Sequence, residues 1–112
     1  MDAGTRRRQP TEIAYTVIST ANGGERKTKI MYGAALNITQ LNKYLELLLD
    51  RGMISMESGR RYRATEKGRK FLATYDRCME TRSLLRAQEK ALFEFLSFAP
   101  RRAQQLEAPP LQ

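Results

Sequence analysis

The chain has 112 residues and a mass of 12.9 kDa, the size of one small domain with an appendage. Its 20 Lys and Arg residues outnumber its 12 Asp and Glu residues, giving a formal net charge of +8 and a sequence pI near 10.1, so we expect a polyanionic partner. It has no histidine, one cysteine, no carboxylate cluster at metal-ligand spacing and no nucleotide-binding glycine loop, so we expect neither an enzyme nor a cofactor or metal site.

The charge is concentrated in the first part of the chain. Residues 1–70 carry 14 basic and 7 acidic side chains, whereas residues 71–112 carry 6 and 5. The lone Cys78 cannot form an intrachain disulfide, and no apolar stretch resembles a signal peptide or approaches the roughly 18 residues of a membrane span. We therefore expect a cytoplasmic protein with no membrane partner.

The first nine residues lack apolar periodicity and are expected to form a flexible basic arm. Pro10 suits the first turn of a helix, and the apolar residues that follow at helical spacing predict a helix over 12–21, ended by Asn22-Gly23-Gly24. Residues 28–34 read as a short second helix, in which Gly33 permits a close approach to a neighbouring element.

A third helix is predicted over 38–51. Asn37 is a good N-cap with Gln40 three residues later, the capping-box arrangement, and Gly52 is a helix stop. Three leucines line its apolar face: Leu41, Leu45 and Leu48.

Two short strands on either side of Ser58-Gly59 are predicted to form a hairpin, with Tyr62 on one face and Arg61 and Arg63 on the other. Thr65 then caps a fourth helix that begins near Glu66 and meets no proline before Pro100. Residues 100–112 are expected to be disordered. The fold class is therefore mainly α with a small β-hairpin.

The fourth helix has a coiled-coil period, with residues of one face separated by alternating steps of four and three. The alternative is an amphipathic helix folded back on its own domain. In an antiparallel pair of such helices Arg82 would face Glu89 of the partner twice, so we expect an antiparallel homodimer. The expected interface consists of Phe71, Tyr75, Cys78, Arg82, Leu85, Glu89, Leu92 and Leu96.

Polar side chains at the start of the third helix are suited to reading DNA bases. Gln40 and Asn42 have the paired donor and acceptor that adenine requires, and Lys43 could reach guanine or a phosphate. The alternative is a solvated helix face. Three basic clusters flank this helix and support contact with double-stranded DNA. The full set of expected DNA-binding residues is Arg6, Arg7, Arg8, Lys27, Thr28, Lys29, Thr39, Gln40, Asn42, Lys43, Arg60, Arg61 and Arg63.

Three stretches, residues 27–34, 36–52 and 65–68, resemble the archaeal ten-kilodalton winged-helix chromatin proteins. The resemblance covers about residues 10–98. It implies a winged helix-turn-helix DNA-binding domain over 10–70, an antiparallel coiled-coil dimerisation helix over 71–99, and association with the nucleoid. The Arg-rich arm and the Pro-containing tail depart from the family pattern.

Three functions remain open: a general chromatin or DNA-bridging protein, a sequence-specific transcriptional regulator of the related archaeal type, and a protein-interaction module that does not touch DNA. The charge distribution argues against the third. A fourth helix of roughly 50 Å exceeds the roughly 34–36 Å between adjacent half-sites on one face of a duplex, which favours bridging or bending.

Overall fold

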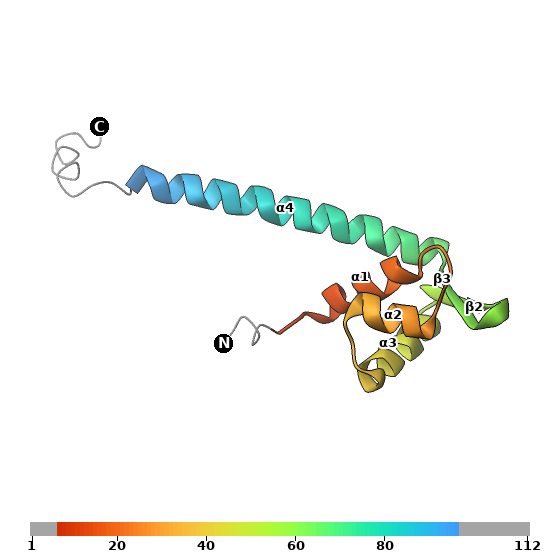
Figure 1. The fold of residues 1–112 in the computed structure, drawn as a ribbon. Coiled ribbons are helices and arrows are strands. Elements are labelled where there is room, and N and C mark those ends of the chain that lie inside the picture. Colours follow the sequence, from red (N-terminus) through yellow and green to blue (C-terminus); the bar gives the residue numbers. More distant parts are fainter. Residues whose placement is uncertain (1–6, 97–112) are drawn as a thin grey trace, which may run out of the picture. The chain divides into compact units, whose positions relative to one another are not determined.

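The computed structural model describes residues 7–96 (Figure 1). The chain divides into two units, one ending at Arg77 and the other beginning at Cys78. We call residues 7–77 the head and residues 78–96 the helical unit. None of the described helices is long and apolar enough to span a membrane.

The head contains three helices, a small sheet and the start of a fourth helix, so the predicted, mostly helical fold class is confirmed. The helices are α1 (Pro10–Ala21), α2 (Lys27–Ala34), α3 (Ile38–Asp50) and α4 (Glu66–Leu96), the last of which continues into the helical unit. The predicted boundaries of the first three lie within two residues of those observed. Pro10 is the first residue of α1, as expected from its fixed φ.

The sheet has three strands rather than the predicted two. β2 (Ile54–Glu57) and β3 (Arg61–Ala64) form the expected hairpin around a 3-10 turn over Ser58–Arg60. β1 (Glu25–Arg26) adds an antiparallel edge to β3, in the order β1-β3-β2. The sequence did not predict β1, because two residues are too few to show an alternating pattern.

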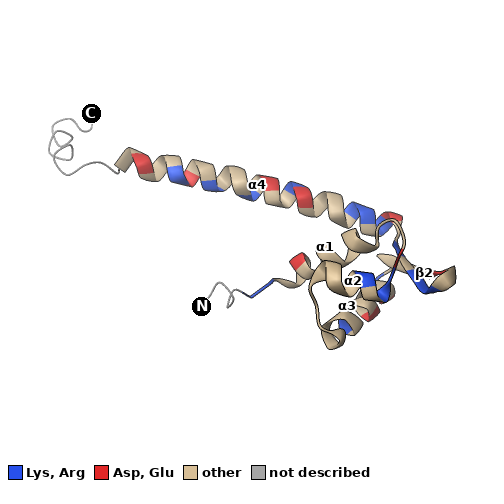
Figure 2. Ribbon diagram, viewed as in Figure 1, with Lys and Arg blue, Asp and Glu red and all other residues tan. Residues whose placement is uncertain are grey.

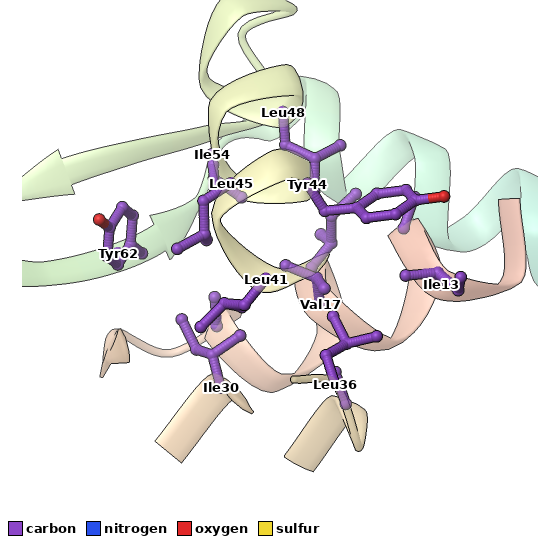
Figure 3. Close-up of a cluster of buried hydrophobic side chains, with 14 of the residues drawn as sticks. Ile13, Val17, Ile30, Leu36, Leu41, Tyr44, Leu45, Leu48, Ile54 and Tyr62 are labelled. Atoms are coloured by element: carbon purple, nitrogen blue, oxygen red, sulfur yellow. The ribbon is translucent and has the colours of Figure 1, made fainter. Parts of the chain in front are cut away.

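The core of the head is apolar throughout (Figure 3). Side chains from α1, α2, α3 and the sheet meet there, and no polar or charged side chain is buried within the described residues. Each large aliphatic side chain removed from water contributes about 1.5–3 kcal/mol to the stability of the fold. The fully buried large side chains are Val17, Ile18, Ile30, Leu41, Leu48 and Ile54.

The first turns of α4 belong to the head. Phe71 and Leu72 pack against the core. The ring centroids of Tyr75 and Tyr15 lie 4.4 Å apart. The Tyr15 hydroxyl donates a 2.8 Å hydrogen bond to Asp76. Phe71 and Tyr75, which were expected in the dimer interface, thus make contacts within their own head.

Two glycines allow close approaches within the head. A Cβ on Gly33 would lie 2.7 Å from Thr20 Cγ2, so the predicted close approach at this residue is confirmed and joins α2 to α1. A Cβ on Gly68 would collide with the carbonyl oxygen of Met53, which accepts a hydrogen bond from the Thr65 amide. The Thr65 hydroxyl in turn accepts from the Gly68 amide, as predicted for the cap of α4.

Replacing Gly68 with alanine should therefore destabilise the head by about 2 kcal/mol, because backbone rather than a flexible side chain must move to admit the methyl group. Urea unfolding monitored by circular dichroism measures this change. Gly23→Ala is the matched control, since nothing lies within 4 Å of a Cβ at that position. Equal stability of the two variants would contradict the proposed close packing.

Candidate nucleic-acid interface

Polar side chains are exposed at the N-terminal end of α3. Leu41, Tyr44, Leu45 and Leu48 are buried, which fixes the rotation of the helix about its axis. The predicted reading residues, Thr39, Gln40, Asn42 and Lys43, are all exposed, as is Ile38 before them. The structure thus places these side chains together on the solvent side of one helix end.

Gln40 has a second role in the structure. Its backbone amide donates a 2.8 Å hydrogen bond to Asn37 Oδ1, and its side-chain Oε1 accepts a 3.3 Å hydrogen bond from the Asn37 amide. The predicted capping box is therefore confirmed. A bidentate contact with adenine would use the same Oε1 as an acceptor, so the capping hydrogen bond competes with base reading by this side chain.

The pairing of β1 with β3 joins two basic clusters that lie far apart in the sequence. Arg26 is paired with Arg61, and α2 begins at the next residue, Lys27. The wing, defined as residues 54–64, therefore lies beside the start of α2. Figure 2 shows Lys and Arg both at this helix start and along the wing.

A hollow of about 450 Å³ opens between these elements. We call it the basic hollow; its walls carry cationic side chains, and free backbone N–H groups of the α2 N-terminus add a further preference for an anion. The exposed side chain of Met56 and the nearly buried ring of Tyr62 supply an apolar part. It is lined by Arg26, Lys27, Thr28, Met56, Arg60 and Tyr62.

Arg26 and Met56 did not figure among the expected site residues. Arg26 could have been found from the run Arg26-Lys27-Thr28-Lys29, which has three cations in four residues. Lys29 is exposed on α2 but does not line the basic hollow. No sequence pattern indicated Met56, because its exposed position depends on the register of β2 with β3.

The three wing arginines differ in how far their charge is compensated. Arg63 forms a 2.9 Å ion pair with Glu57 on the neighbouring strand, and this hydrogen bond lowers the pKa of the Glu57 carboxyl. Arg61 makes only a long, 3.5 Å hydrogen bond to the Gly24 carbonyl. Arg60, at the end of the turn, forms no ion pair with any described residue. Arg60 and Arg61 are therefore the wing cations most available to a phosphate.

The expected basic arm is only partly within the described residues. Arg6 lies outside them, and Arg7 is exposed. Arg8 departs from the prediction, because its guanidinium donates to the Ala34 carbonyl at 2.9 Å and to Thr16 Oγ1 at 3.1 Å. It satisfies a carbonyl at the C-terminus of α2 and is held to the head rather than free to enter a groove.

Within residues 7–96, no three side chains of the His, Cys, Asp or Glu type are grouped so as to hold a metal ion. Cys78, the only cysteine, is exposed.

Comparison with known protein families identifies the fold. The model of a winged helix-turn-helix family matches residues 7–83, most of the chain. The chain belongs to the winged helix-turn-helix family. In the terms of that family, α2 and α3 correspond to the helix-turn-helix, and β2 and β3 correspond to the wing.

Solved structures agree with this assignment. Sso10a-2, a DNA-binding protein from Sulfolobus solfataricus, superposes with a TM-score of 0.70 at 26% identity, over 82% of this chain and 100% of its own. The expected resemblance to archaeal winged-helix DNA-binding proteins is therefore confirmed.

Two members of the MarR family share the fold at lower identity. A Mycobacterium tuberculosis protein solved in complex with DNA has 19% identity and a TM-score of 0.53, over 82% of this chain and 78% of its own. A transcriptional regulator from Silicibacter pomeroyi has 16% identity and a TM-score of 0.50, over 78% of this chain and 75% of its own. No curated protein sequence matches the chain.

The capping box makes Asn37 and Gln40 structural residues of α3. Asn37→Ala should lower the free energy of unfolding by about 1 kcal/mol, because the first turn of the helix loses a hydrogen-bond acceptor. Thermal or urea unfolding measures the loss. Asn42→Ala, an exposed change on the same helix outside the box, is the control and should alter stability by no more than about 0.5 kcal/mol. Equal losses in the two variants would argue against the cap.

Proposed function

We propose that this winged helix-turn-helix protein binds double-stranded DNA as a homodimer and acts as a chromatin-type, DNA-bridging protein of the nucleoid. The observation that carries the proposal is the basic hollow, where the β1–β3 pairing groups Arg26, Lys27 and Arg60 beside a helix N-terminus. A duplex offers a row of phosphates to such a surface. The proposal includes no catalytic role and no cofactor.

The named neighbours support binding to DNA. Sso10a-2 is described as a DNA-binding protein, and the Mycobacterium tuberculosis MarR protein was solved with DNA bound. In our proposal α3 enters the major groove with Thr39, Asn42 and Lys43 toward the bases, while the basic hollow and Lys29 hold the flanking backbone. Arg6 and Arg7 remain candidates for a minor-groove contact.

A general DNA-binding role is favoured over sequence-specific regulation by the state of Gln40. Its side-chain oxygen accepts a hydrogen bond in the helix cap, and this bond competes with base reading by Gln40. Affinity would then come mainly from phosphate contacts, which carry no sequence information. Sequence-specific regulation is the second candidate, favoured by the shared fold with MarR regulators.

Removing two wing cations should weaken binding to every duplex. We expect Arg60→Ala/Arg61→Ala to lower affinity for an unrelated duplex and to reduce the slope of log K against log salt by about two, one for each lost phosphate contact. Fluorescence anisotropy across a salt series measures both quantities. The matched control, Arg86→Ala/Lys90→Ala, removes the same net charge from the helical unit and should leave the slope nearly unchanged.

The wild-type chain is measured in the same series on an unrelated duplex and on DNA upstream of its own gene. Similar affinities with steep salt slopes support the chromatin-type role, whereas a large preference for one sequence supports the regulator. Absence of binding to either duplex at low salt would overturn DNA binding and favour the interaction module.

The proposed homodimer forms through α4 beyond the head. Arg82 and Glu89 are both exposed, and an antiparallel pair would set each against the other across the interface. Arg82→Glu should therefore weaken the dimer in sedimentation equilibrium, since like charges then meet, and adding Glu89→Arg should restore it. A double variant that remains as weak as the single one would contradict the antiparallel arrangement.

A further inference from the structure

Ile38, the first residue of α3, is an apolar side chain that the core of the head does not use. It is 50% exposed, more than any other apolar residue of the helix. It belongs neither to the buried core nor to the partly buried side chains packed against that core. Single exposed apolar side chains are common on protein surfaces, so the surroundings of Ile38 decide what it contacts.

The N-terminal half of α3 is the half that can approach a polyanion. Residues 38–45 include Lys43 and no Asp or Glu. The two acidic residues of the helix, Glu46 and Asp50, both lie in its C-terminal half. The helix dipole adds partial positive charge at the N-terminus. The helix end that carries Ile38 is therefore the end whose charge suits the major groove of a duplex.

Ile38 and Asn42 lie on the same side of α3. Four residues advance about 40° around a helix axis and about 6 Å along it, and both of these residues are exposed. Successive base pairs of a duplex lie about 3.4 Å apart, so the two side chains span about two base pairs. An asparagine amide suits adenine, and an apolar side chain suits the methyl group of thymine. Together the two side chains suit adjacent A·T pairs.

The capping box holds Ile38 in a defined position. Asn37, immediately before it, accepts a 2.8 Å hydrogen bond from the Gln40 amide, so the first turn of α3 is closed around Ile38. A β-branched side chain in a helix also has one strongly preferred rotamer. Contact with a ligand would therefore cost Ile38 little conformational entropy.

We propose that Ile38 contacts the 5-methyl group of thymine in the major groove, and that the protein therefore prefers thymine-containing duplexes to matched duplexes that lack this methyl group. The inference rests on the DNA binding of the proposed function and adds a base preference to it. Phosphate contacts made by the basic hollow do not distinguish bases, whereas among the four bases only thymine presents a methyl group in the major groove.

Replacement of thymine by deoxyuridine tests the contact. Two duplexes of the same alternating A·T sequence, one with thymine and one with deoxyuridine, have the same phosphates and hydrogen-bonding groups and differ only in the methyl groups. We expect the wild-type chain to bind the thymine duplex roughly fourfold more tightly, the effect of removing about one methyl-sized group from water. In Ile38→Ala this ratio should fall to about one. Fluorescence anisotropy at one fixed salt concentration measures both affinities.

Leu49→Ala is the matched control. It removes the same number of carbon atoms from the same side of α3, three turns further along, where the helix has acidic neighbours. This variant should keep the wild-type ratio. Far-UV circular dichroism verifies that each variant is folded. Ile38→Ser replaces the alanine variant if that protein does not fold, because serine also removes the apolar group and is compatible with the first turn of a helix.

The possible outcomes separate this inference from the proposed function. Equal binding of the two duplexes by the wild-type chain would overturn the inference and leave DNA binding intact. A fourfold ratio that persists in Ile38→Ala would assign the methyl contact to another side chain and overturn the role of Ile38. Absence of binding to both duplexes at low salt would overturn the proposed function itself.

Discussion

The candidate interface depends on one short piece of sheet, the pairing of β1 with β3. Glu25 and Arg26 lie opposite Tyr62 and Arg61, so the chain enters α2 directly beside the wing. Without this edge, the cations of residues 26–29 and those of residues 60–63 would belong to two separately positioned segments. The nearly buried Tyr62 anchors the pairing to the core, which connects the position of the charges to the hydrophobic packing of the head.

The sequence predicted most of the fold because its signals were local. Pro10, the Asn37–Gln40 box, the Ser58-Gly59 turn and the Thr65 cap each act within a few residues, and each is found in the predicted place. β1, the contacts of Arg8 and the packing of Tyr75 on Tyr15 arise between segments distant in the sequence. Periodicity and capping rules carry no information about such contacts. Most individual residues of the candidate site could therefore be predicted from the sequence, but their arrangement in space could not.

Several polar and charged side chains of the head have structural roles. Arg8 satisfies a helix-end carbonyl, and Arg63 is paired with Glu57, so neither offers its full charge to a ligand. Gln40 caps the helix that it was expected to use for reading bases. The cations that remain available, Arg26 and Arg60 among them, surround the basic hollow. Such a surface favours the uniform phosphate backbone over particular bases.

The most direct measurement is a nuclear magnetic resonance titration of the isotope-labelled chain with a short duplex of unrelated sequence. The account predicts that the largest changes in amide chemical shift fall on residues 26–29 and on the wing residues Arg60 and Arg61, with smaller changes at the start of α3. Changes confined to residues 78–96, or no changes at low salt, would contradict a DNA interface centred on the basic hollow.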